Sequence, residues 1–274
     1  MRILIFGDSI AYGAFDRRGG WAQRLKESLE RETLPRSKFA ISVYNLGASG
    51  NTTEDLLARF DSDTRKKSDP RDETMFIFAI GINDTQHAHG KTGGRVSLTA
   101  FRRNILSLIR LSRRYSQKIA FVGLTPVDES KTIPIRWDPD KSYNNRSIKA
   151  YDKAIRLVCK KNGILFVDIH KEMMALDYAE LLCDGLHPNS KGHEKLYEMV
   201  NAAIRPMLPV RSERKKSAGA RSYTSRLISL AKRDRLQALA TRMRWAWLCW
   251  KQEFDSSNAE REEKPKPHID VQKV

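Results

Sequence analysis

The sequence predicts a three-layer α/β/α sandwich built on a five-stranded parallel sheet, followed by a basic helical extension. Over the first two hundred residues, short apolar runs alternate with longer segments of helical pattern. The apolar runs are nearly continuous, which is typical of strands buried on both faces. Because strands and helices alternate strictly, the strands should lie parallel and be joined by right-handed crossovers.

Five strands are expected, with the predicted helices in the connections between them and after the last strand. The strands are "RILIF" (2–6), "ISVYN" (41–45), "MFIFAI" (75–80), "KIAFVGL" (118–124) and "ILFVD" (164–168). The helices lie near 20–32, 53–65, 97–115, 144–162 and 189–204. The fourth helix ends in "KKNG", basic residues followed by a glycine, which is a common helix stop. Two long loops, 81–96 and 125–145, are either the border of a site or plain surface insertions.

Composition excludes several classes of protein. Of the 274 residues, 40% are hydrophobic and 30% are charged, which fits a globular protein. No apolar run approaches the roughly 18–20 residues of a membrane span, and we expect no secretory signal. The three cysteines, Cys159, Cys183 and Cys249, are scattered without a C-x-x-C spacing. They indicate reduced thiols in a cytoplasmic protein and no zinc site.

Polar residues follow the predicted strands at one edge of the sheet. Ligands bind beyond the carboxyl ends of strands in open parallel sheets, so these residues are candidates for a site. They are Ser9, Gly47, Gly50, Asn51, Asn83, Asp84, Asp184 and His187. A hydroxyl, an imidazole, a carboxylate and donors for a developing negative charge are what acyl transfer requires.

Each candidate also has a structural interpretation. Ser9 could cap the helix after the first strand, and Gly50 could be an ordinary turn glycine. Asn83 and Asp84 together are a common turn pair. Cys183, four residues before His187, could be a thiol nucleophile, but a cysteine in this context is more often a small buried hydrophobe. All the candidates are expected at the same edge of the sheet, and this coincidence favours the functional interpretation.

Four blocks of the sequence resemble the SGNH hydrolases, also called GDSL esterases and lipases. They are "FGDSIAYG", "NLGASGNTT", "GIND" and "DGLHP", in that order over about residues 1–205. Further matches at "GGW" (19–21) and "VDESKT" (127–132) are similar to the cytosolic bacterial acyl-esterase branch. The resemblance implies a flavodoxin-like fold. It also implies a nucleophile at Ser9, a base at His187, an orienting carboxylate at Asp184, and an oxyanion hole made by Ser9, Gly50 and Asn83.

The activity implied is hydrolysis of an acyl ester, with lysophospholipids and thioesters as further candidates, through a Ser-His-Asp acyl-enzyme mechanism without metal or organic cofactor. The catalytic set would be the same in an O-acyltransferase. A third alternative is a catalytically silent domain whose basic tail binds membrane or nucleic acid. His193, six residues after His187, is expected on the surface or as a polar group behind the site.

The C-terminal part differs from the rest in charge and pattern. The formal net charge is +17, and from Arg205 onward 17 Lys and Arg face 8 Asp and Glu. We predict a hydrolase domain at 1–207, a linker at 208–224, and a basic amphipathic helix with a disordered tail at 225–274. The helix at 225–254 could dock on the domain or a partner, or lie on the inner membrane surface. Nucleic acid is the least favoured partner, and the oligomeric state is open.

Overall fold

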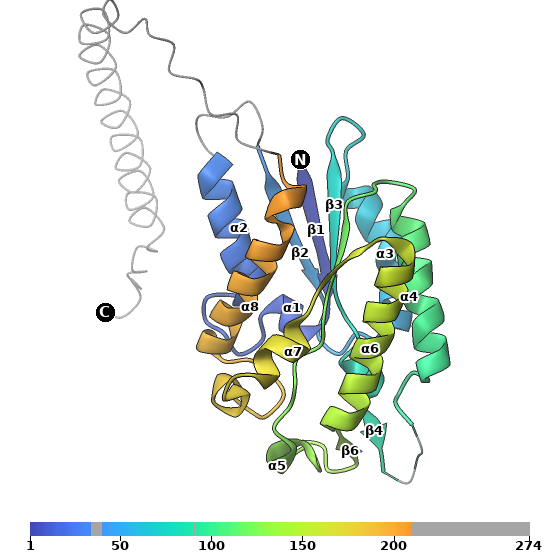
Figure 1. The fold of residues 1–274 in the computed structure, drawn as a ribbon, viewed down its shortest axis with the longest axis vertical. Coiled ribbons are helices and arrows are strands. Elements are labelled where there is room, and N and C mark those ends of the chain that lie inside the picture. The colour runs from blue at the N-terminus through green and yellow to red at the C-terminus, as the bar shows by residue number, and fades with distance from the viewer. Residues whose placement is uncertain (34–39, 90, 92, 210–274) are drawn as a thin grey trace, which may run out of the picture. The chain divides into compact units, whose positions relative to one another are not determined.

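A parallel five-stranded sheet forms the centre of the protein in a computed structural model, which describes residues 1–33, 40–89, 91 and 93–209 (Figure 1). The strands follow the order β2–β1–β3–β5–β7 and all pair in parallel. Their bounds are Arg2–Gly7 (β1), Ser42–Gly47 (β2), Thr74–Ala79 (β3), Ile119–Val122 (β5) and Leu165–Val167 (β7). The predicted fold class is confirmed, and each predicted strand is present with ends shifted by one or two residues.

Helices cover both faces of the sheet. In Figure 1, α2 and α8 lie on one side of the strands and α3, α4 and α6 on the other. Their bounds are Gly20–Thr33 (α2), Thr53–Lys67 (α3), Leu98–Ser112 (α4), Asn145–Asn162 (α6) and Ser190–Ile204 (α8). Side-chain caps determine where several helices begin. Thr52 and Asp55 form a capping box at the N-terminus of α3, and Asn189 caps the N-terminus of α8. Gly163 ends α6 in the left-handed conformation, where the sequence predicts the stop.

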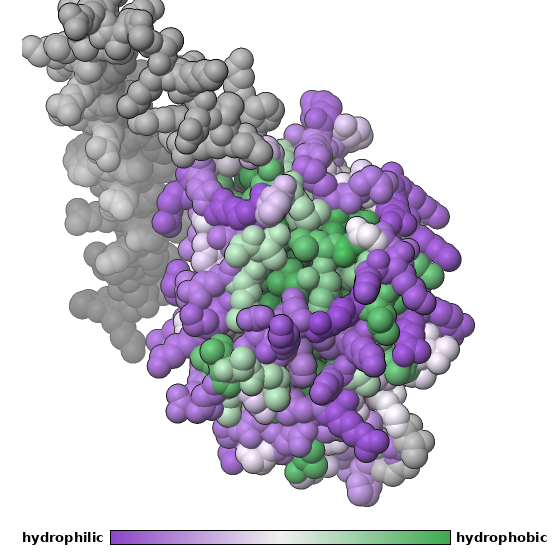
Figure 2. Space-filling model, viewed as in Figure 1, coloured by the Kyte–Doolittle hydropathy of each residue, from purple (hydrophilic) through white to green (hydrophobic). Residues whose placement is uncertain are grey.

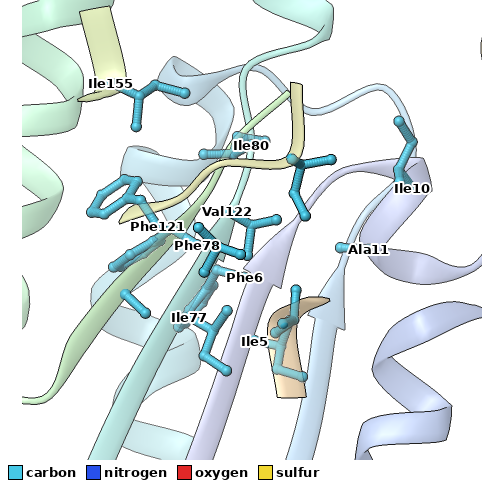
Figure 3. Packing of buried hydrophobic residues seen from close by; sticks show 14 of the residues in the cluster. Ile5, Phe6, Ile10, Ala11, Ile77, Phe78, Ile80, Phe121, Val122 and Ile155 are labelled. Atoms are coloured by element: carbon cyan, nitrogen blue, oxygen red, sulfur yellow. The ribbon is translucent and has the colours of Figure 1, made fainter. Parts of the chain in front are cut away.

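Aromatic and branched side chains fill the space between the layers. Phe6, Phe78 and Phe121 come from three neighbouring strands and pack ring against ring, with centroids 5.8 and 4.8 Å apart. Figure 3 shows them within the apolar cluster, beside aliphatic side chains from the same strands. All three rings are fully buried. Burial of this kind stabilises the fold by about 25 cal/mol per Å² of apolar surface and holds the strand ends firmly in place.

The chain reverses its direction across the sheet between β1 and β3. From β1 it runs outward to β2, and then it returns past β1 to place β3 on the other side. The connections after β1 and β3 therefore diverge and leave room at the carboxyl ends of these two strands, which is where ligands bind in such sheets.

Several short elements lie in the loops beyond the strand ends. They are α1 (Ser9–Tyr12), η1 (Asn83–Thr85), β4 (His87–Ala88), α5 (Glu129–Thr132), β6 (Lys141–Ser142), α7 (Ile169–Met174), η2 (Tyr178–Leu181) and η3 (Arg205–Met207). The two long predicted loops are joined to each other, because β4 in the first pairs with β6 in the second. Elements of two to six residues are too short to show a clear hydrophobic period, so the sequence does not reveal them.

The surface is polar over most of the face in Figure 2, and apolar side chains gather in its middle, between α8 and α6. Among the described residues, no helix has both the length and the apolarity that crossing a membrane requires. The predicted amphipathic helix and tail at 225–274, and all but the first two residues of the predicted linker at 208–224, lie outside the described residues.

Candidate active site

Ser9, His187 and Asp184 form one continuous hydrogen-bonded chain. The Ser9 Oγ and His187 Nε2 atoms are 2.9 Å apart, and His187 Nδ1 lies 2.7 Å from Asp184 Oδ2. A carboxylate can only accept at Nδ1, so the proton sits there and Nε2 is left to accept from the serine hydroxyl. The geometry gives a hydroxyl, a base and an orienting group in the order required for nucleophilic attack.

The fold places Ser9 at the start of α1, directly after β1. Asp8, and not Ser9, caps this helix, because the Asp8 carboxylate accepts from the N–H of Ile10 at 3.0 Å. The structural alternative for Ser9 is therefore wrong, and its hydroxyl is free to face His187.

Asp184 and His187 share one tight loop between η2 and α8. Asp184 Oδ1 accepts from the backbone N–H of Leu186 at 2.9 Å and of His187 at 2.7 Å, so the carboxylate shapes the loop that carries the imidazole. Burial tends to raise the pKa of Asp184, but hydrogen bonds from His187 outweigh it and the pKa is lowered. The carboxylate is thus ionised at neutral pH.

Two backbone N–H groups that follow β1 and β2, those of Ser9 and Gly50, are candidates for binding a ligand. Neither the N–H of Ser9 nor that of Gly50 donates a hydrogen bond within the described part of the chain. Gly50 has a φ of +77°, a conformation that disfavours residues with a Cβ. Gly47 serves a different need: a Cβ there would lie 2.4 Å from the Tyr12 backbone nitrogen, so glycine lets β2 end against α1.

Asn83 supplies a side-chain donor from η1, on the other side of the strand reversal. Its Nδ2 donates to the Asn51 carbonyl at 3.0 Å, and the second Nδ2 hydrogen is available to a ligand. Its Oδ1 accepts from the Tyr143 hydroxyl at 3.0 Å, and Gln86 donates to the same hydroxyl at 2.8 Å. Tyr143 is a supporting residue that sequence reasoning missed.

Arg59 was also missed, although it holds the glycine-rich turn in place. From α3, its guanidinium donates to Asn51 Oδ1 at 2.7 Å and to the Leu46 carbonyl at 2.8 Å. It also forms an ion pair with Asp63 at 2.9 Å. An arginine on a helix has no sequence signal that would separate this role from a solvated surface charge.

Two buried carboxyl groups lie close to the site. Burial raises the pKa of Asp8 to about 7, against the effect of its hydrogen bonds and of nearby His187. Burial also raises the pKa of Asp84 to about 7, although its carboxylate accepts from the backbone and hydroxyl of Thr53. Asp84 therefore joins η1 to the start of α3, which is more than the turn pairing suggested by the sequence.

The structure excludes one interpretation of Cys183 and one of the two offered for His193, while the other, a polar group behind the site, fits the buried His193. Cys183 is exposed and not a buried hydrophobe, and its thiol donates to the His187 carbonyl at 3.2 Å, away from the imidazole. Partial burial, with help from Asp184, raises the pKa of this thiol. His193 is fully buried and not on the surface; its Nδ1 accepts from the Trp21 N–H at 3.3 Å. Burial lowers the pKa of His193 to about 4.

The described residues contain no cluster of three or more His, Cys, Asp or Glu side chains that could hold a metal ion. The polar groups that follow the strand ends are instead a hydroxyl, backbone N–H groups, an amide and an imidazole. These groups suit an organic substrate with a carbonyl oxygen.

Comparison with known proteins places the chain among esterases. Residues 5–195 match the GDSL-like Lipase/Acylhydrolase family. The isoamyl acetate-hydrolyzing esterase of Saccharomyces cerevisiae is 23% identical, over 76% of this chain and 87% of its own length. The acetylxylan esterase of Geobacillus stearothermophilus is 24% identical, over 70% and 88%. The crystal structure of the lipase/acylhydrolase from Enterococcus faecalis shares the fold, with a TM-score of 0.60 at 23% identity, over 77% of this chain and 99% of that one.

Proposed function

Because the chain belongs to the GDSL-like lipase/acylhydrolase family and is an ester-bond hydrolase, we propose that it cleaves a carboxylic ester by acyl transfer through Ser9. The observation that carries this mechanism is the chain of short contacts from Ser9 Oγ to His187 to Asp184. The acetylxylan esterase has been crystallised with a serine-to-alanine and with an aspartate-to-alanine substitution, each described as a catalytic mutant. This supports a serine and an aspartate as catalytic groups in a chain of this fold.

In the first step, Ser9 Oγ attacks the ester carbonyl carbon while His187 Nε2 takes the hydroxyl proton. The imidazolium that forms donates through Nδ1 to ionised Asp184, which stabilises its charge. The carbonyl oxygen, now negative, would receive hydrogen bonds from the N–H groups of Ser9 and Gly50 and from Asn83 Nδ2. Donors fixed in advance are the largest single source of rate enhancement in such reactions.

The tetrahedral species then collapses and expels the alcohol. His187 Nε2 returns its proton to the leaving oxygen, and the acyl group stays on Ser9 Oγ. A water molecule repeats the attack with His187 as base, and the carboxylic acid leaves with Ser9 restored.

The substrate class that we propose is an ester with a short acyl group. The named substrates of two relatives, isoamyl acetate and acetylxylan, are both acetate esters that differ widely in their alcohol. We also propose a cytoplasmic location, which rests on the scattered cysteines of the sequence.

The test is hydrolysis of p-nitrophenyl esters from acetate to decanoate, with Ser9→Ala and Cys183→Ala proteins in parallel. We expect wild-type activity to be highest on the esters with the shortest acyl chains. Activity should vanish in Ser9→Ala and persist in Cys183→Ala. Circular dichroism checks that each variant is folded. Full activity in Ser9→Ala together with loss in Cys183→Ala would contradict the assignment of the nucleophile.

A further inference from the structure

Two exposed aromatic side chains border the imidazole of His187. The ring of Phe15 has its centroid 5.0 Å from that of His187, and the ring of Trp137 has its centroid 6.3 Å away. Phe15 is 71% exposed and Trp137 is 57% exposed. Large apolar side chains that stand in solvent beside a catalytic base leave their rings free to contact a ligand.

We propose that Phe15 and Trp137 form the binding site for the alcohol half of the ester, and that this alcohol has an extended C–H face. The inference rests on the proposed acyl transfer at Ser9. Such a face is presented by a branched alkyl chain or by one side of a sugar ring, and both pack well on aromatic rings.

The direction of proton transfer assigns the two rings to the alcohol and not to the acyl group. His187 Nε2 must come within hydrogen-bond reach of the leaving oxygen, about 3 Å, to give it a proton. The carbon atoms attached to that oxygen therefore lie beside the imidazole, where both rings are found. In the proposed mechanism the carbonyl oxygen is held by other groups, the donors of Ser9, Gly50 and Asn83.

The loop that carries Phe15 is built rigidly. Phe15 has a φ of +62°, a conformation that costs energy for a bulky residue, and such strain persists only where the surroundings enforce it. The next residue, Asp16, is buried, accepts from the Gly20 N–H at 3.0 Å and is paired with the buried Arg24. Arg24 in turn reaches Glu194 of α8 at 2.8 Å. The loop between α1 and α2 is thus fixed to two helices while its phenyl ring stays in solvent.

The loop that carries Trp137 is held by backbone hydrogen bonds. Ile135 is fully buried at its base, and its N–H donates to the Lys141 carbonyl at 2.9 Å. The N–H of Tyr143 donates to the Thr132 carbonyl at 3.0 Å, so this loop connects directly to the residue that holds Asn83. The backbone that carries each ring is therefore held in place before a ligand binds, which lowers the entropy lost on binding.

The experiment compares acetate esters that differ only in their alcohol: methyl acetate, isoamyl acetate and a methyl xyloside carrying one acetyl group. A second series keeps ethanol as the alcohol and lengthens the acyl group from acetate to butyrate. Wild-type protein, Phe15→Ala, Trp137→Ala and Leu157→Ala are assayed on both series. Leu157 is the matched control, an exposed apolar side chain on α6, outside the loops that carry the site.

We expect each aromatic variant to lose about 10-fold in kcat/KM on at least one of the two larger alcohols, and less than about 2-fold on methyl acetate. The acyl series should show no change in its chain-length preference. The hydrolysis rate of the acyl-enzyme, measured after a p-nitrophenyl acetate burst, should be unchanged because the alcohol has already left. Trp137→Phe, which keeps an aromatic ring, should retain most of the kcat/KM on the larger alcohols that Trp137→Ala loses.

Equal losses on all alcohols would overturn the inference, because the rings would then act on His187 itself. A loss that follows acyl length would overturn it too. Phe15→Gly, which tolerates a positive φ, separates loss of the ring from loss of the loop conformation. If wild-type protein hydrolysed no ester, the proposed function would fail and this inference with it, whereas equal losses would remove only the inference.

Discussion

The Tyr143 hydroxyl donates to Asn83 Oδ1 across 3.0 Å, and both side chains are almost fully buried. Since an amide can present either its oxygen or its nitrogen, this bond decides which atom faces the site. With Oδ1 engaged by Tyr143, Nδ2 donates to the Asn51 carbonyl, and its second hydrogen is the one that the proposed mechanism assigns to the carbonyl oxygen of the substrate. A residue far along the chain thereby sets the orientation of a proposed oxyanion donor.

Tyr143→Phe should lower kcat by about 3- to 10-fold with little change in KM, because the loss of one neutral hydrogen bond costs about 1 kcal/mol. In an Asn83→Ala background the same change should have almost no further effect on kcat. Additive losses in this double-mutant cycle would show that Tyr143 does not act through Asn83. Tyr115→Phe is the control, since its hydroxyl bonds to Asp61 at 2.8 Å, between α3 and the end of α4.

Asn83→Ala should lower kcat by roughly 10²–10³-fold, a loss of about 3–4 kcal/mol, because the donor matters most once negative charge has formed on the carbonyl oxygen. KM should change much less. Steady-state kinetics on a short ester measure both constants. A rise in KM at constant kcat would make Asn83 a residue that binds the ground state only.

His187→Ala should be as inactive as Ser9→Ala. Asp184→Asn should lower kcat by about 10²–10⁴-fold, because the amide would present N–H groups to His187 Nδ1 and favour the wrong tautomer. The backbone N–H groups of Leu186 and His187, which donate to Asp184 Oδ1, could donate equally to the amide oxygen of the asparagine, so the loop should keep its conformation. The melting temperature of Asp184→Asn checks this, and near wild-type kcat in the variant would argue against an orienting role.

His193 should make the protein less stable in acid. Burial lowers its folded-state pKa to about 4, below the unfolded value of about 6.5. As pH falls from about 6.5 to 4, the unfolded chain takes up a proton that the folded chain resists, so stability drops over this range by on the order of 3 kcal/mol. Protonation would also break the bond that Nδ1 accepts from Trp21.

Urea unfolding of wild-type protein and His193→Gln between pH 4.5 and 8 tests this. As the pH falls, the unfolding free energy of wild-type protein should decrease more than that of His193→Gln. Parallel stability curves would mean that His193 titrates normally in the folded state.

Removal of residues 210–274, which lie outside the described residues, should leave turnover on a soluble short ester unchanged. Ser9, Gly50, Asn83, Asp184 and His187 all lie within the unit formed by Met1–Val210. The same truncation should weaken binding to anionic vesicles, since each Lys or Arg near such a surface contributes about 1 kcal/mol. Co-sedimentation at low and high salt measures this, and equal sedimentation of both proteins would exclude the membrane interpretation.

The sequence by itself determined the sheet and the candidates for the site. Continuous apolar runs such as "MFIFAI" show that a strand is buried on both faces, and Gly163 shows where α6 ends, because these are local consequences of residue type. The spacing of Asp184 and His187 also keeps their contact within one loop, so that part of the site is visible without the fold.

Only the tertiary structure decided what approaches these residues from elsewhere in the chain. Tyr143 meets Asn83 across 60 positions, and Ser9 meets His187 across 178. The hydroxyl of Tyr143, the guanidinium of Arg59 and the rings of Phe15 and Trp137 carry no periodic signal, because their roles depend on loop conformations and on strand order. His193 illustrates the same point: its helical position left open a surface residue or a polar group behind the site, and only the packing of α8 against α2, which buries it, decided between them. Local patterns fix elements, whereas burial and long-range hydrogen bonds exist only once the layers have packed together.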